Sequence, residues 1–193
     1  MKSFILMLWK AVDPVYYACT RLRRAENSLF RVRLTRYKGR SIVLSDGCEI
    51  AKNDLLVKIH IHNVRIFKDL RHVKNDLKKT RLLYREVERS LPALADYIKS
   101  HRKRDEIRGV IGITMINRGY RRLGFEGSEI SNRFYKWMKS MILVPIYLMS
   151  VKSPSFKQLK KQNPNYLFMS KHVLMARYTE QSEQKEKLPS IPI

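Results

Sequence analysis

An alternating pattern runs through residues 29–37, whose sequence is Leu-Phe-Arg-Val-Arg-Leu-Thr-Arg-Tyr. Its apolar positions are separated by polar ones, with Arg31 and Arg33 between Phe30, Val32 and Leu34. A period of two places successive side chains on opposite faces of a strand. The pattern therefore predicts a half-buried strand whose outer face is basic.

Two more strands are predicted after this one. A turn at 38–40 leads into a returning strand at 41–45, and the Asp-Gly pair at 46–47 is a strong hairpin signal before a short piece at 48–50. The next strand covers residues 55–63. Its two expected faces are Leu55, Val57, Ile59 and Ile61 on one side and Leu56, Lys58, His60 and His62 on the other.

From residue 64 the apolar spacing becomes helical. Pro92 predicts the start of a new helix with Ser90 as its N-cap. Strands are expected at 107–113 and 125–130.

An amphipathic helix is expected at 132–144, ending before Pro145. Its predicted inward side chains are Phe134, Trp137, Met138, Met141 and Ile142. A short strand at 166–169 precedes a final helix at 171–178, which Ser170 caps.

These elements predict an α+β fold, in which a small, mostly antiparallel sheet is packed by several helices. The N-terminal hairpins and the later strands would form that sheet. We expect a single basic domain at 1–179 and a disordered polar tail at 180–193.

The charge of the chain predicts an anionic partner. Forty Lys and Arg residues stand against seventeen Asp and Glu residues, which gives a formal net charge of +23. The excess is spread over the whole chain, so it belongs to the folded body. Such a body is attracted to polyanions, and we expect an anionic membrane surface or a phosphate-bearing envelope polymer, with nucleic acid as the alternative.

A basic patch around the first strand is the candidate anion-binding surface. Tyr37 lies within it and would suit stacking beside phosphate contacts. The alternative is a merely solvated strand face. The candidate residues are Arg31, Arg33, Arg36, Lys38, Arg40 and Lys58.

His60 and His62 have the strand spacing that two ligands of one metal ion can use. Lys58 on the same face opposes metal binding, because the ion adds positive charge. We therefore expect no metal and no cofactor. If the chain is an enzyme, the candidate catalytic residues are His60, Asn63, Thr114 and Glu126.

The cellular setting is predicted from two further features. Cys19 and Cys48 are too few for a disulfide framework, and the apolar run at 4–9 is too short for a signal peptide or a membrane span. We expect a cytoplasmic protein, peripheral at the inner face of the cell membrane if it binds lipid.

An ordered set of short stretches resembles the YkoP-like domain family of Firmicute bacteria. They are Arg33–Gly39, Leu44–Gly47, Lys52–Asp54, Ile59–Asn63, Gly112–Thr114, Arg122–Glu126, Phe168–Ser170 and Arg177–Tyr178. That domain occurs alone or behind polysaccharide deacetylase domains, so the resemblance implies a setting near cell-envelope polysaccharide metabolism and no particular reaction. The leading expectation is a non-catalytic accessory or binding domain. The alternatives are a nucleic-acid binder of low sequence specificity and an enzyme centred on His60.

Overall fold

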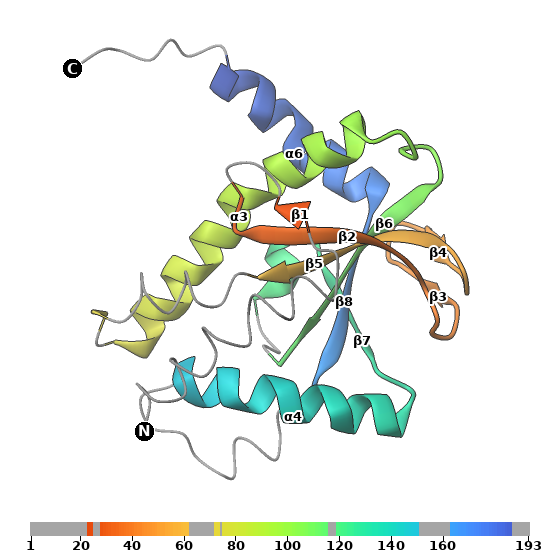
Figure 1. Cartoon of the computed structure of the whole chain (residues 1–193). Helices are drawn as coiled ribbons and strands as arrows, with labels where there is room; N and C mark the ends of the chain where they lie inside the picture. Colours follow the sequence, from red (N-terminus) through yellow and green to blue (C-terminus); the bar gives the residue numbers. More distant parts are fainter. Residues whose placement is uncertain are drawn as a thin grey trace, which may run out of the picture.

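The computed structural model describes residues 23–24, 28–61, 72–73, 75–115, 119–150 and 163–186, and its centre is a six-stranded sheet (Figure 1). The strand order is β1-β2-β5-β6-β8-β7, and every neighbouring pair is antiparallel except β5 with β6. The strands are β1 (Arg23–Arg24), β2 (Phe30–Arg36), β5 (Leu55–Ile61), β6 (Ile107–Thr114), β7 (Glu126–Glu129) and β8 (Asn165–Ser170). The predicted α+β fold with a mostly antiparallel sheet is confirmed.

The helices lie on both sides of this sheet (Figure 1). They are α3 (Asp76–Ser100), the short 3-10 helix η1 (Tyr120–Leu123), α4 (Arg133–Ser150) and α6 (Lys171–Glu186). Side chains of α3 and α6 share one buried cluster with the sheet. Helix α4 lies on the opposite side, where its Tyr135 stacks on Tyr166 of β8.

Each face of the sheet carries its own hydrophobic cluster. Val32, Val57 and Val110 belong to the larger cluster, under α3 and α6. Leu56 and Phe168 point to the other face and belong to a smaller cluster. The alternation predicted for the strand at 55–63 is thus confirmed for the described part of it, β5.

The partner of the first strand differs from the prediction. β2 pairs with β5 along its full length and not with residues 41–45. Residues 38–53 form an excursion from the sheet between β2 and β5. Two backbone hydrogen bonds join its ends: Tyr37 N donates to Asp54 O (2.9 Å), and Asn53 N donates to Tyr37 O (2.7 Å). Within it, β3 (Ile42–Val43) and β4 (Glu49–Ile50) form the hairpin that the Asp-Gly pair predicts.

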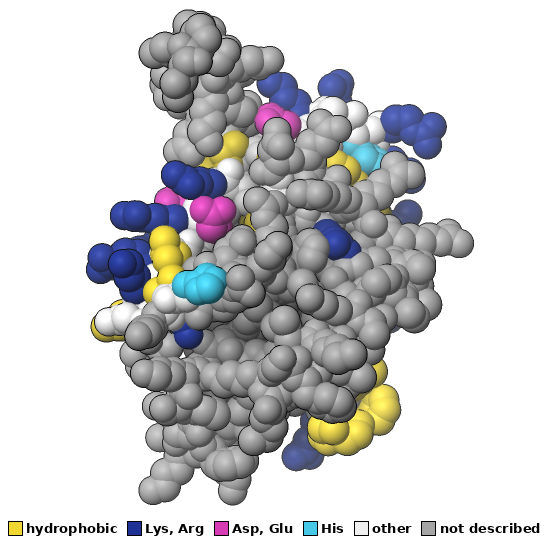
Figure 2. Space-filling model, turned by 60° about the vertical axis from the view of Figure 1, so that its left-hand side comes forward, with side chains coloured by type: hydrophobic (Ala, Val, Ile, Leu, Met, Phe, Trp, Pro, Cys, Tyr) yellow, Lys and Arg dark blue, Asp and Glu magenta, His cyan; other side chains and the backbone are white. Residues whose placement is uncertain are grey.

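Helix α4 corrects two predictions. It continues through Pro145 to Ser150, so the proline lies inside the helix and not at its end. Three of the side chains expected to face inward are instead exposed, namely Phe134, Trp137 and Met141. Figure 2 shows hydrophobic side chains gathered on the surface at the end of the molecule where Figure 1 places α4. Met138 is half-buried.

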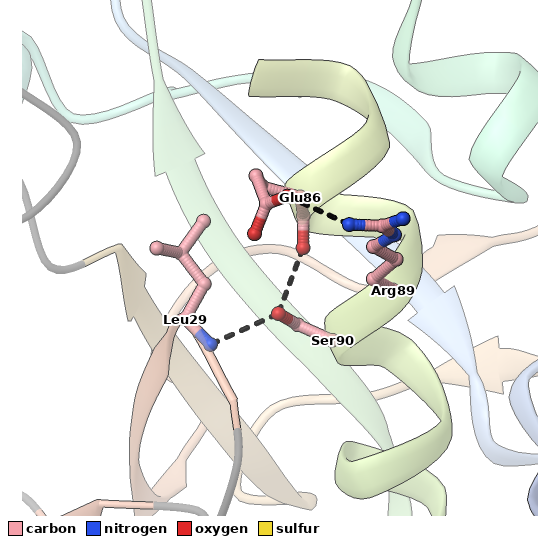
Figure 3. A network of polar contacts seen from close by, with 4 residues as sticks. All are labelled: Leu29, Glu86, Arg89 and Ser90. Carbon is pink, nitrogen blue, oxygen red and sulfur yellow. Dashed lines mark hydrogen bonds and ion pairs between the residues drawn. The ribbon is translucent and has the colours of Figure 1, made fainter. Parts of the chain in front are cut away.

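Helix α3 does not restart at Pro92, which lies inside it. Ser90 is no N-cap: its Oγ donates to Glu86 O (2.8 Å) and accepts from Leu29 N (2.9 Å), as Figure 3 shows. The serine therefore connects the middle of α3 to the start of β2. The helix persists because Leu91 and Leu94 on both sides of the proline are fully buried.

The C-terminal helix is longer than expected. Ser170 Oγ accepts from Val173 N (3.0 Å), so the predicted cap of α6 is confirmed. The helix ends at Glu186 rather than Tyr178, because Glu, Gln and Lys favour helix even without apolar positions. Some residues of the sequence analysis lie outside the described residues. They are the apolar run at 4–9, Cys19, His62, Asn63 and residues 187–193.

Candidate functional site

The pairing of β2 with β5 gathers basic side chains on one face of the sheet. Arg33 lies opposite Lys58, and Arg31 lies opposite His60. The intervening residues, Val32 among them, point into the core under α3. The four polar side chains therefore project toward the side of α4. The structure thus brings together Arg31, Arg33 and Lys58 of the predicted basic patch.

Lys58 is the most deeply buried of these cations, with only 9% of its surface exposed. Burial, together with the charges of Lys139 and Arg33, lowers the pKa of its ammonium to about 8. No ion pair among the described residues involves Lys58. It is a buried cation whose charged neighbours on the described part of the chain are themselves cations.

Lys139 is a member of the site that the sequence did not reveal. It comes from α4, and its pKa is lowered by burial and by the nearby charge of Arg33. Its Nζ lies 5.3 Å from the ring centroid of Tyr135, within the range of a cation–π contact. Nothing in the local sequence separates Lys139 from Lys136, since only the docking of α4 brings one of them to the sheet. We call Arg33, Lys58 and Lys139 the cation cluster.

His60 lies next to the cation cluster and is neutral. Burial, and then the charges of Lys58, Arg33 and Lys139, lower its pKa to about 3. A cation beside an imidazole favours its neutral form. In the described ranges no group of three or more His, Cys, Asp or Glu side chains could hold a metal ion.

Aromatic rings adjoin the cation cluster on the same face. Tyr135 of α4 stacks on Tyr166 of β8, with ring centroids 6.4 Å apart and planes inclined by 25°. Tyr37 meets Tyr166 edge-on at 6.2 Å. Burial raises the pKa of Tyr166 to about 12. This aromatic packing joins α4 to the sheet and brings the charge of Lys139 near those of Arg33 and Lys58.

The other residues of the predicted patch lie away from the cluster. Arg36 is at the far end of β2, three residues or roughly 10 Å along the strand from Arg33, and its Nη1 donates to Asn53 O (2.9 Å). Lys38 and Arg40 follow in the excursion and are exposed. These three cations add positive surface but do not converge on Lys58.

The candidate catalytic residues are not brought together by the described structure. Thr114 shares the sheet face of Val110, which is opposite to that of His60. Glu126 lies on β7, three strands from β5 and roughly 14 Å away. Its carboxylate accepts from Ser45 N (2.9 Å) and Ser45 Oγ (2.8 Å), so it holds the β3–β4 hairpin to the sheet.

A second surface feature lies on the outer side of α4. Phe134, Trp137 and Met141 are 72%, 60% and 62% exposed. Their spacing places them on one helical face, which is turned to solvent because Tyr135 and Lys139 face the sheet. The helix contains Arg133 and Lys136 as well as Lys139, and no acidic residue. Figure 2 shows a basic side chain beside the exposed hydrophobic ones.

The comparisons with known proteins agree with the resemblance found in the sequence. Residues 2–178 match the YkoP domain. The chain belongs to the YkoP family. Its relatives include "Uncharacterized protein YkoP" of Bacillus subtilis (strain 168), which is 44% identical over 181 residues, covering 92% of this chain and 98% of the relative. No solved structure matches this YkoP-family chain. Among the described residues, no helix is long and apolar enough to cross a membrane.

Proposed function

We propose that this YkoP-family domain is a non-catalytic binding domain that attaches peripherally to an anionic membrane surface. The observation that carries the proposal is the exposed apolar face of α4, formed by Phe134, Trp137 and Met141 beside basic residues of the same helix. Contiguous exposed apolar side chains on a soluble domain mark an interaction site.

The composition of this face favours a lipid interface. Interfacial helices combine aromatic and aliphatic side chains on one face with Lys and Arg at its border, and lie in the plane of the headgroups. Trp is favoured at that depth because its ring is apolar and its N–H is polar. Each Lys or Arg near an anionic leaflet adds about 1 kcal/mol of attraction. Arg133 and Lys136 supply such charges beside Trp137.

A nucleic acid or a polymeric envelope phosphate would be attracted by the same net charge of +23. Neither requires an apolar helix face next to the cations, although a ring such as that of Trp137 would also stack on an unpaired base. The membrane is therefore the favoured partner, and the polyanions are outcomes of the test below.

Flotation of the full chain with lipid vesicles tests the proposal. We expect the protein to float with phosphatidylglycerol-containing vesicles and to stay at the bottom with phosphatidylcholine alone. A Phe134→Ser/Trp137→Ser variant loses flotation, whereas Leu77→Ser, which removes an exposed apolar side chain from α3, keeps it. Equal flotation of the double variant and the wild type would exclude α4 as the contact.

A competition arm separates the partners. Random duplex or single-stranded DNA is added to protein already bound to anionic vesicles. Retention on the vesicles supports the membrane proposal. Release by nucleic acid, together with equally tight nucleic-acid binding by the Phe134→Ser/Trp137→Ser variant, would replace it with polyanion binding through the basic surface.

A further inference from the structure

The cation cluster has a property that general surface attraction does not explain. Only 9% of the surface of Lys58 is exposed, and the charges that act on it are those of Lys139 and Arg33. The Nε of Arg33 is also buried and has no hydrogen-bond partner in the described part of the chain. Burying a charged group without a partner costs free energy, and a bound anion would supply the missing opposite charge.

We propose that Arg33, Lys58 and Lys139 form a discrete site for the phosphate group of a ligand. The three cations come from β2, β5 and α4, so the fold itself assembles them. No acidic residue in the described ranges forms an ion pair with any of them. The site thus goes beyond the diffuse attraction of a basic surface.

The geometry favours phosphate over a singly charged anion. Arg33 and Lys58 are direct cross-strand neighbours, so their charged groups reach one anion from adjacent strands. A guanidinium presents paired donors that match the oxygens of phosphate, and an ammonium adds three donors around a compact charge. Three positive charges balance a phosphate dianion better than a carboxylate.

Two sources could provide such a group, a soluble phosphate monoester or the headgroup of phosphatidic acid. The position of Lys139 on α4 links the site to the helix whose outer face carries Phe134 and Trp137. The soluble form of the proposal does not depend on membrane binding, because it is tested with small phosphates in free solution.

Isothermal titration with inorganic phosphate and with glycerol 3-phosphate tests the site in the absence of lipid. Chloride at matched ionic strength controls for screening of the net charge. We expect saturable binding by the wild type, weakened at least about tenfold in Lys58→Met. Lys38→Gln removes an exposed cation that follows the same strand and should bind like the wild type. If Lys58→Met does not fold, Arg33→Gln and Lys139→Gln replace it.

Vesicle binding then identifies the source. Phosphatidic acid vesicles are compared with phosphatidylserine vesicles of equal surface charge. A preference for phosphatidic acid that disappears in Lys58→Met assigns the site to a lipid headgroup. Binding of glycerol 3-phosphate without such a preference assigns it to a soluble phosphate monoester. The proposal would be overturned if neither the soluble phosphates nor phosphatidic acid bound in a way that depends on the cation cluster. The proposed contact of α4 with the membrane would then still stand.

Discussion

Lys58 lies directly opposite Arg33 across the antiparallel pair of β5 and β2. Like charges at directly opposed positions of a sheet destabilise it, and here one of the two is almost fully buried. The domain therefore keeps an arrangement that costs folding free energy. Local departures from the most stable choice are expected at functional sites.

Replacing Lys58 by Met should stabilise the domain at neutral pH. The pKa of Lys58 is lowered from 10.5 to about 8, so the folded state holds a proton on Lys58 at pH 7 at a cost of up to about 3 kcal/mol. Met has a similar length and needs no solvation. We expect the free energy of unfolding in urea to rise by about 2 kcal/mol, while Lys38→Met stays within about 0.5 kcal/mol. A Lys58→Met variant less stable than the wild type would show that the charge has a favourable partner.

The lowered pKa of Lys58 also predicts how the free energy of unfolding changes in the alkaline range. Between pH 8 and 10.5 the unfolded chain binds more protons at Lys58 than the folded domain does. Stability should therefore rise with pH through this window. The rise should be smaller in Lys58→Met, which keeps only the contribution of Lys139, whose pKa is also lowered. Burial raises the pKa of Tyr166 and Tyr178 to about 12, so above pH 10 tyrosine ionisation in the unfolded chain opposes the trend. Urea midpoints below pH 10 for both proteins provide the measurement.

The lowered pKa of His60 predicts that the free energy of unfolding decreases in acid. Its pKa falls from 6.5 to about 3 on folding, so the unfolded chain binds the proton first as the pH decreases. The contribution is present above pH 6.5 and is lost progressively toward pH 3. We expect the wild type to lose about 2 kcal/mol more than His60→Gln between pH 7 and pH 4. The exposed His172 is the control, and parallel profiles for His60→Gln and His172→Gln would contradict the assignment.

Ser90 should contribute far more to stability than a serine in the same local geometry. Both Ser90 and Ser100 donate to the carbonyl four residues earlier in α3, but only Ser90 also accepts from Leu29 N. Ser90→Ala leaves a buried backbone donor unsatisfied, which costs about 1–3 kcal/mol. Ser100→Ala, at an exposed position, should cost less than about 0.5 kcal/mol. Thermal unfolding of both variants tests this, and equal shifts would mean that the bond to Leu29 contributes nothing.

Local periodicity was enough to predict most elements of the fold. Alternation identified β2 and β5, and the Asp-Gly pair identified the β3–β4 hairpin, because these signals depend on a few neighbouring residues. The partner of β2 was not predictable in this way. It depends on the closure of residues 38–53 by Tyr37, Asn53 and Asp54, which is a long-range contact.

The errors on helices have a common physical origin. A proline predicts a helix boundary, but Pro92 and Pro145 both lie inside helices. Around Pro92, the burial of Leu91 and Leu94 outweighs the missing hydrogen bond. The apolar spacing of α4 predicts side chains that face the core, yet Phe134, Trp137 and Met141 are exposed. Periodicity predicts that a helix has an apolar face, but not which face the tertiary structure buries.

The candidate site was half predictable. Strand alternation predicted one face for Arg31 and Arg33 and, on another strand, one face for Lys58 and His60. Only the register of β2 with β5 makes these residues neighbours. Lys139 could not be found, since its contribution depends on how α4 docks through Tyr135 and Tyr166. The burial of Lys58 was equally unpredictable from the sequence, because a lysine in a strand is ordinarily solvated.

The most direct test of the proposed membrane contact is the fluorescence of Trp137. The chain has two tryptophans, so a Trp9→Phe background leaves Trp137 alone. If α4 enters the lipid interface, titration with phosphatidylglycerol-containing vesicles shifts its emission to shorter wavelength and protects it from an aqueous quencher, while phosphatidylcholine vesicles change neither. Vesicle binding with unchanged Trp137 emission and quenching would show that another surface makes the contact and would contradict the account.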